Sequence, residues 1–100
     1  MTYTLIFSPE AELDILTALE YTEKRWSAEQ ADCYNAHINS GLQLIRENPY
    51  IGRARTDISV KHRSFPIEQH VAVYFIEGDT VYLSRLFHHS KDIKQLCTSI

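Results

Sequence analysis

The chain has 100 residues, of which 44% are hydrophobic and 23% charged, as is usual for one soluble globular domain. Its net charge of −3 argues against a general nucleic-acid binder, which needs a surplus of Lys and Arg. No run of residues is apolar enough to cross a membrane, and the first eight residues are too short and uncharged to be a signal peptide. Two cysteines, Cys33 and Cys97, without a spaced Cys/His set predict reduced thiols in a cytoplasmic protein, and no metal site or cofactor.

The chain begins with a segment that favours a strand and then a helix. Tyr3–Phe7 is rich in aromatic and β-branched residues, which suit a strand. Ser8 is a good N-cap and Pro9 is favoured at the first helical position, so a helix is predicted over residues 9–25. Apolar residues recur at helical spacing within this range, which predicts one buried face.

A second helix is predicted over residues 28–47. Ser27 and Gln30 form a capping box, and Asn48-Pro49 ends the helical pattern. Apolar residues recur at intervals of three and four along this segment, so one face is again apolar. Two helices joined by so short a link are expected to be antiparallel neighbours.

The second half of the chain reads as a loop followed by strands. Residues 49–61 show no clean period and predict an irregular loop, and Glu77-Gly78-Asp79 is a tight hairpin signal. Pro66 interrupts the strand pattern and predicts an edge or a turn there. The expected strands cover residues 61–65, 70–76 and 80–87, and a short helix or tail covers residues 90–98.

These elements predict an α+β domain spanning residues 1–100. Two antiparallel helices should pack on a four-stranded, mostly antiparallel sheet in the order β-α-α-β-β-β, because each helix has only one apolar face. The N-terminal strand is expected at one side of the three C-terminal strands.

The strand over residues 70–76 is apolar on both faces. Alternation places Val71, Val73 and Phe75 on one side, with Ala72, Tyr74 and Ile76 on the other. One side is expected to pack under the helices, and the other to be an exposed interface. The alternative is that the chain's own tail buries both faces.

An ordered set of motifs resembles the ParE toxins of the RelE/ParE superfamily of toxin–antitoxin modules. The motifs are E-N-P-x-x-G from Glu47 to Gly52, R-x-F-P-x-x-x-H from Arg63 to His70, and R-x-x-H-x-x-x-D from Arg85 to Asp92. The opening strand with Ser8-Pro9-Glu10-Ala11 and the pair Arg25-Trp26 add to the resemblance, which runs almost end to end.

The resemblance implies a small bacterial toxin of a type II toxin–antitoxin system that inhibits DNA gyrase by binding. It also implies a ParD-like antitoxin that wraps the toxin in a hetero-oligomer. The expected contacts with the target are Arg63, Arg85, His88, Lys91 and Asp92. The expected contacts with the antitoxin are Tyr34, Arg53, Arg55 and Tyr74.

The alternative enzyme function is that of a RelE-like, ribosome-dependent mRNA endonuclease. Such a reaction needs a base, a cationic stabiliser for the phosphate and an acid. Arg63, Arg85 and His88 would supply this set, with Glu68 as a base. The competing interpretation is that these arginines pair with nearby acids and anchor the tail to the sheet. The acidic chain favours that interpretation, so no catalytic residue is expected. A third class is a non-toxic module that only titrates an antitoxin.

The five histidines do not show metal-ligand spacing. His88 and His89 are neighbours on one strand and are expected to point to opposite faces, so that they cannot easily share a metal ion. His70 and His88 are expected to approach each other across strands. His37 and His62 have no assigned partner. The sequence therefore predicts structural or solvent-exposed histidines.

Overall fold

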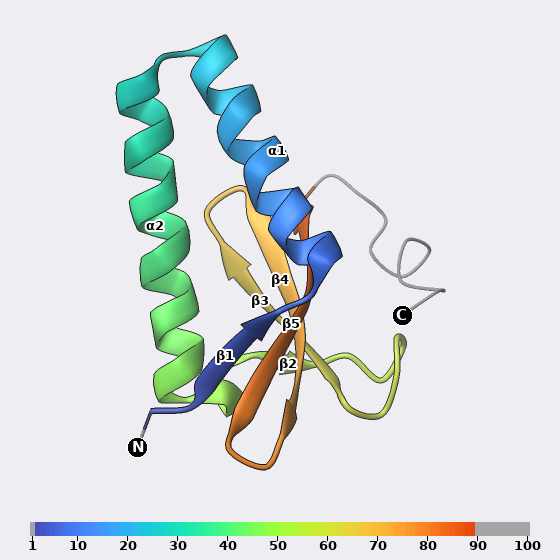
Figure 1. The fold of residues 1–100 in the computed structure, drawn as a ribbon. Helices are drawn as coiled ribbons and strands as arrows, with labels where there is room; N and C mark the ends of the chain where they lie inside the picture. Colours follow the sequence, from blue (N-terminus) through green and yellow to red (C-terminus); the bar gives the residue numbers. More distant parts are fainter. Residues whose placement is uncertain (1, 90–100) are drawn as a thin grey trace.

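The computed structural model describes residues 2–89 and confirms the predicted α+β architecture (Figure 1). Two antiparallel helices cover one face of a mostly antiparallel sheet, and both helices have the predicted bounds. The elements in chain order are β1 (Thr4–Phe7), α1 (Pro9–Arg25), α2 (Ala28–Glu47), a 3₁₀ turn (Pro49–Ile51), β2 (Arg53–Ala54), β3 (His62–Ile67), β4 (His70–Glu77) and β5 (Thr80–His88).

The sheet has five strands in the order β1-β5-β4-β3-β2, so the predicted count of four was wrong by one. β1 pairs with β5 in parallel, and the other neighbours are antiparallel. The additional strand, β2, lies in the predicted loop and pairs Arg53 with Ser64 and Ala54 with Arg63. A strand of two residues is too short for any alternation of polar and apolar residues to reveal it.

β3 is longer than predicted because it continues through Pro66. Pro66 pairs with Val71 of β4, while β2 reaches only to Ser64 of β3 on the other side. β3 is therefore an edge strand at Pro66, as the sequence indicated, and the missing N–H of proline does not break the ladder. The hairpin to β4 turns at Glu68, whose φ of 55° lies in the left-handed region.

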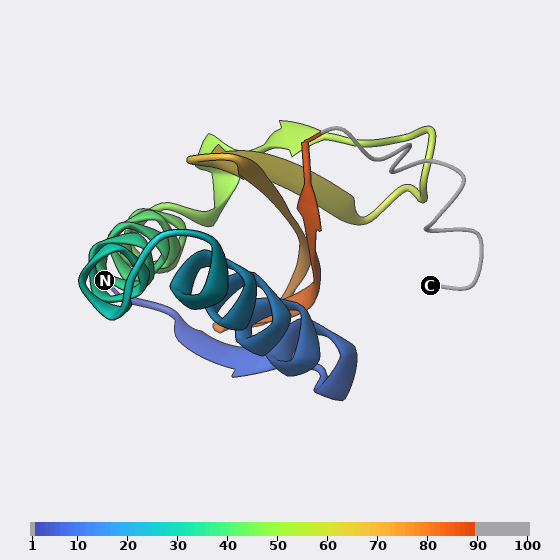
Figure 2. The same cartoon turned by 90° about the horizontal axis from the view of Figure 1, so that it is seen from above.

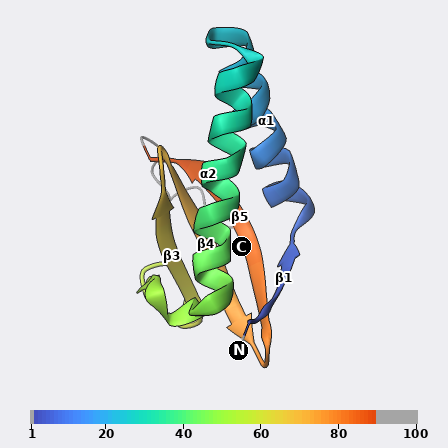
Figure 3. The same ribbon diagram turned by 90° about the vertical axis from the view of Figure 1, so that its left-hand side faces the viewer.

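Both helices begin at the predicted serines. Ser8 Oγ accepts a hydrogen bond from Ala11 N at 3.0 Å, and Ser27 Oγ accepts one from Gln30 N at 3.1 Å. α1 packs on β5 and α2 on β3, so the helical layer lies on one side of the twisted sheet (Figure 2). The turn between the helices projects beyond the sheet (Figure 3).

The main core lies between the helices and the sheet. It includes Ile38 and Ile45 of α2, with Tyr74 of β4 and Leu83 of β5. A second cluster, formed by Val73 and Phe87, lies outside this core, and Ile58 of the 55–61 segment packs against it. Val73 is 0% exposed, so the expectation of an exposed interface on the second face of β4 was wrong at its centre.

The predicted tail helix over residues 90–98 lies outside the described residues, as do Lys91, Asp92 and Cys97. Between residues 2 and 89, no helix is both long and apolar enough to span a membrane.

Candidate functional site

A bulge in β5 directs Arg85 toward α1. Val73 of β4 pairs with Arg85 and Tyr74 pairs with Leu83, so Ser84 is the extra residue on β5. Bulges bend a strand and redirect the side chains beside them. Arg85 Nε donates to Asp14 Oδ2 at 2.8 Å and Nη2 donates to Oδ1 at 3.1 Å, which is a bidentate ion pair. Asp14 Oδ2 also accepts from Leu86 N at 2.9 Å.

This geometry gives Arg85 a structural partner. The guanidinium also lies 4.4 Å from the ring centroid of Phe87. The competing interpretation of the arginines, that they pair with nearby acids, therefore holds for Arg85. Asp14 was not singled out as that partner, because the two residues are 71 positions apart and nothing in the sequence links them.

The end of the sheet beside this ion pair carries an aromatic and imidazole cluster. Tyr34 of α2 hydrogen-bonds Nδ1 of His70 through its hydroxyl. The ring centroids of His70 and His88 are 5.5 Å apart, which confirms the predicted approach of these two histidines. His88 stacks on His89 at 4.6 Å, with an angle of 27° between the rings. The expectation that His88 and His89 point to opposite faces was therefore wrong, because β5 and its pleat end at His88.

The protonation of this cluster follows from its surroundings. Burial lowers the pKa of His70, and the neighbouring His88 and His89 lower it further, while Asp14 acts in the opposite direction. Burial raises the pKa of Tyr34. A hydrogen bond with the Gln69 backbone lowers this pKa, and the negative charge of the nearby Glu68 raises it. Both shifts favour the neutral form of each partner in this hydrogen bond.

A second constellation links Tyr74 and Arg63 to the Glu47–Gly52 motif. Tyr74 Oη donates to the carbonyl of Pro49 at 2.5 Å and accepts from Gly52 N at 3.1 Å. Arg63 Nη1 donates to the carbonyl of Gly52 at 2.7 Å, and its guanidinium lies 5.0 Å from the ring centroid of Tyr50. These residues hold the segment after α2 against the centre of the sheet.

Two of the predicted site residues, Tyr74 and Arg63, take part in this network. Tyr74 is 0% exposed, so it does not contact an antitoxin as predicted, and burial raises its pKa. The error arose because both faces of β4 are apolar and alternation alone does not tell which face the helices cover. Arg63 is half-buried and donates to the carbonyl of Gly52. This bond is separate from the ion pair between Arg85 and Asp14.

Basic residues in the predicted loop over residues 49–61 form ion pairs. Arg55 forms a bidentate pair with Asp57, with N–O distances of 2.9 and 2.8 Å, and Lys61 lies 3.8 Å from Glu77. Arg53 lies on β2 and is exposed. Of the predicted antitoxin contacts, Arg53 is therefore the most accessible, while Tyr34 is half-buried and engaged with His70.

The residues of the alternative nuclease do not come together as one set. Arg85 and His88 belong to the same end of β5, but Arg63 is bound at Gly52. Glu68 pairs with His37 at 3.3 Å. In the part of the chain that the structure describes, no group of three or more His, Cys, Asp or Glu could hold a metal ion.

Several large apolar side chains are exposed on the helical layer. Leu13 and Leu16 of α1 are 63% and 57% exposed, and Trp26 at the projecting turn is 69% exposed. None of these three residues was predicted to lie at a binding site. The sequence signal for this surface, which was overlooked, is the spacing of Leu13 and Leu16, three residues apart and off the buried face of α1.

The fold of this chain is shared with a solved structure. A solved chain described as "Chromosomal ParDE TA system from P. aeruginosa" has the same fold, with a TM-score of 0.75 at 15% identity. The match covers 87% of this chain and 96% of that chain. The arrangement of two helices on a curved sheet is therefore that of a known class of small toxin–antitoxin proteins.

The family is shown by sequence as well. The model of the ParE toxin of the type II toxin–antitoxin system parDE matches residues 5–93, and the chain belongs to this family. Toxin ParE1 of Mycobacterium tuberculosis is 27% identical over 94 residues, which cover 93% of this chain and 96% of that protein. Toxin ParE1 of Caulobacter vibrioides is 28% identical over 87 residues, covering 87% and 90%.

Proposed function

We propose that this chain inhibits DNA gyrase by binding to it, without catalysing a reaction of its own. The observation that supports this most strongly is the match to the ParE toxin model over residues 5–93. The engagement of Arg85 with Asp14 and of Arg63 with Gly52 also argues against the nuclease alternative, because both cations are used within the fold. The contact with the target would involve His88, which is exposed at the end of β5, and the predicted Lys91 and Asp92.

We further propose that a ParD-like antitoxin neutralises the chain in a cytoplasmic hetero-oligomer. The solved neighbour is described as belonging to a ParDE system, which supports a partner of this kind. The exposed Arg53 and the apolar residues on α1 offer surfaces for such a partner.

A supercoiling assay tests the proposed target. Purified chain added to gyrase and relaxed plasmid should slow supercoiling and let cleaved DNA accumulate. The product of the adjoining upstream reading frame should restore the activity of gyrase when it is added. The same chain added to translating ribosomes should leave the transcript intact.

Three results would contradict parts of this proposal. Transcript cleavage at the ribosomal A site with unaffected gyrase would establish the endonuclease alternative. Normal viability of a host that expresses the chain alone would favour the non-toxic binding module. Failure of the upstream product to bind the chain would remove the antitoxin assignment while leaving the gyrase result intact.

A further inference from the structure

The two edges of the sheet are protected to very different degrees. β2 forms one edge, with two residues and an exposed Arg53, and short charged edges resist pairing with other chains. β1 forms the other edge with the sequence Thr-Leu-Ile-Phe, which contains no charge and no proline. Ile6 is 45% exposed on this strand. Edge strands of this kind recruit a further strand unless something covers them.

The backbone of β1 presents free hydrogen-bonding groups on its outer side. Thr4 N donates to Asp79 O and Ser8 N donates to Leu83 O, each at 3.0 Å, so the even-numbered residues face β5. The odd-numbered residues face the other way, as Tyr3 shows by donating to Arg46 O at 2.9 Å. Across residues 2–89, no hydrogen bond satisfies the outward backbone groups of Leu5 and Phe7.

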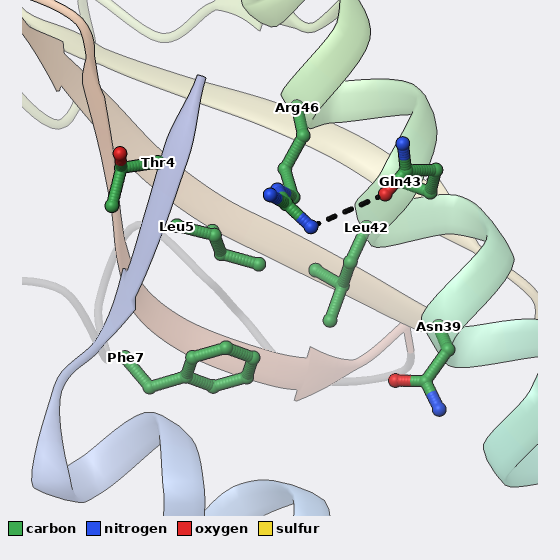
Figure 4. A pocket seen from close by; sticks show the side chains of 7 residues that line it. All are labelled: Thr4, Leu5, Phe7, Asn39, Leu42, Gln43 and Arg46. Carbon is green, nitrogen blue, oxygen red and sulfur yellow. Dashed lines mark hydrogen bonds between the residues drawn. The ribbon is translucent and has the colours of Figure 1, made fainter. Parts of the chain in front are cut away.

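These groups lie beside a groove of about 500 Å³ between β1 and α2 (Figure 4). Leu5 and Phe7, which are half-buried, provide most of its apolar surface, and Leu42, which is 3% exposed, adds little to it. The opposite wall is polar, and its Gln43 donates through Nε2 to Glu47 Oε1 at 3.3 Å. Its members on α2 are Asn39, Gln43 and Arg46.

Arg46 gives this groove a positive end. Its Nε donates to Tyr3 O at 3.1 Å and its Nη1 donates to Gln43 Oε1 at 3.3 Å. The guanidinium is therefore fixed in place beside the start of β1. A carboxylate entering the groove would meet a cation already held in position, which lowers the entropy lost on binding.

We propose that the groove between β1 and α2 binds an extended, acidic segment of the antitoxin as an added strand along β1. The backbone of this segment would pair with Leu5 and Phe7, one of its apolar side chains would cover the Leu5, Phe7 and Leu42 surface, and a carboxylate would face Arg46. This mode of recognition obtains affinity from main-chain hydrogen bonds and specificity from alternate side chains. The inference rests on the proposed antitoxin partner.

The space beside β1 limits the length and the kind of segment that can bind there. Arg46 closes the open edge at Tyr3, and α1 begins at Pro9, so about four residues or roughly 13 Å of extended chain fit between them. A second copy of the chain is a poorer fit, because its own β1 is flanked by α2 and would bring one α2 against the other. A slender peptide meets no such obstacle.

Amide hydrogen exchange on the whole chain, alone and with the purified upstream-frame product, tests this proposal. In the free chain the amides of Leu5 and Phe7 should exchange fast, whereas those of Thr4 and Ile6 should be protected by β5. In the complex, we expect the amides of Leu5 and Phe7 to slow by about 100-fold or more, because each gains an acceptor.

A matched pair of variants tests the groove itself. Gln43→Trp fills the groove from the exposed side of α2 and should weaken the complex by roughly tenfold or more, since it blocks the added strand. Gln30→Trp places the same change at an exposed position on the opposite side of α2, and binding should stay within about twofold. Circular dichroism and thermal unfolding of both variants establish that each is folded.

Each alternative result overturns the inference in a distinguishable way. A complex that forms without protection of Leu5 and Phe7, or that tolerates Gln43→Trp, places the antitoxin elsewhere and leaves the antitoxin proposal intact. Absence of a complex removes the antitoxin proposal and this inference together. Protection that rises with the concentration of the free chain, accompanied by a dimer in sedimentation, assigns the edge to a second copy.

Discussion

At the scale of single residues, the hydroxyl of Tyr74 is the most consequential polar group in the core. It joins the carbonyl of Pro49 to the amide of Gly52 in a region from which water is excluded. A Cβ at position 52 would lie 2.1 Å from this oxygen. Glycine is therefore required at position 52 by close approach and not by an unusual φ, which is an ordinary −74°.

Tyr74→Phe should destabilise the fold by about 2–3 kcal/mol, because it leaves two buried backbone groups without a partner. Urea unfolding of the variant measures this loss. Tyr82→Phe is the matched control, since Tyr82 is half-buried and its hydroxyl makes no hydrogen bond within the described residues. Its effect should stay below about 0.5 kcal/mol. Equal effects of the two changes would contradict the role assigned to Tyr74.

The buried histidines predict a loss of stability in mild acid. Burial lowers the pKa of His70 in the folded chain below its ordinary 6.5, and burial together with Lys61 lowers the pKa of His62. The unfolded state then binds more protons as pH falls below about 6.5, so the free energy of unfolding decreases there. Urea unfolding at pH 7.5 and pH 5.5 measures this decrease, which should be smaller in His70→Gln. A variant as pH-sensitive as the parent chain would contradict the assignment.

At the scale of the elements, the two helices start in different ways. Ser27 only caps α2, whereas Ser8 caps α1 and also donates through its hydroxyl to Ser84 O at 2.6 Å. The second bond ties the start of α1 to the bulge of β5. The beginning of α1 therefore depends on a contact between segments 76 residues apart.

Ser8→Ala should therefore cost more stability than Ser27→Ala. Loss of a serine cap costs about 0.5–2 kcal/mol, and we place Ser8 at the upper end and Ser27 at the lower. Urea unfolding of the two single variants gives both values under the same conditions. The reverse order would show that the bond to Ser84 contributes nothing to stability.

The elements that the sequence predicted are those defined by local chemistry. Ser8-Pro9, Ser27 and Asn48-Pro49 marked the helix ends because a cap or a proline acts within a few residues. The pairing of β2 and the bond between Asp14 and Arg85 depend on which distant segments meet, and no local pattern carries that information. The bulge at Ser84 likewise changed which way Arg85 and the residues after it point, so simple alternation failed there.

For the candidate site, the sequence predicted which residues to consider but not the role of each. The motifs contain Arg63, Arg85 and His88, and the resemblance also pointed to Tyr74. Their roles did not follow from the sequence, because a motif does not distinguish a residue that holds the fold from one that meets a partner. Tyr74 and Arg85 were expected at binding surfaces, and the structure shows both engaged with other parts of the chain.

At the scale of the whole molecule, stability is concentrated in the middle of the sheet. β4 is flanked by β3 and β5 and carries Ala72, Val73 and Tyr74, all 0% exposed. The projecting turn between the helices and the 55–61 segment have far less buried surface around them. This contrast predicts an order of local opening across the molecule.

Native-state hydrogen exchange should follow that order. The amides of β4 and of its ladder with β5 should exchange slowest, at rates set by global unfolding, and those around Trp26 should exchange fastest. Measurement at several low urea concentrations separates local from global opening. Amides near Trp26 that were as slow as those of β4 would contradict a core centred on the sheet.

The bonds around Tyr74 have a consequence for how relatives of this chain are recognised. Glu47 to Gly52 and Tyr74 make a signature that is easily found in a sequence, yet its glycine, proline and tyrosine satisfy one another inside the molecule. A search based on this signature should therefore select for the fold and not for the binding target. Residues that determine the target should instead be sought among those that face solvent. There a substitution can alter recognition without breaking a buried hydrogen bond.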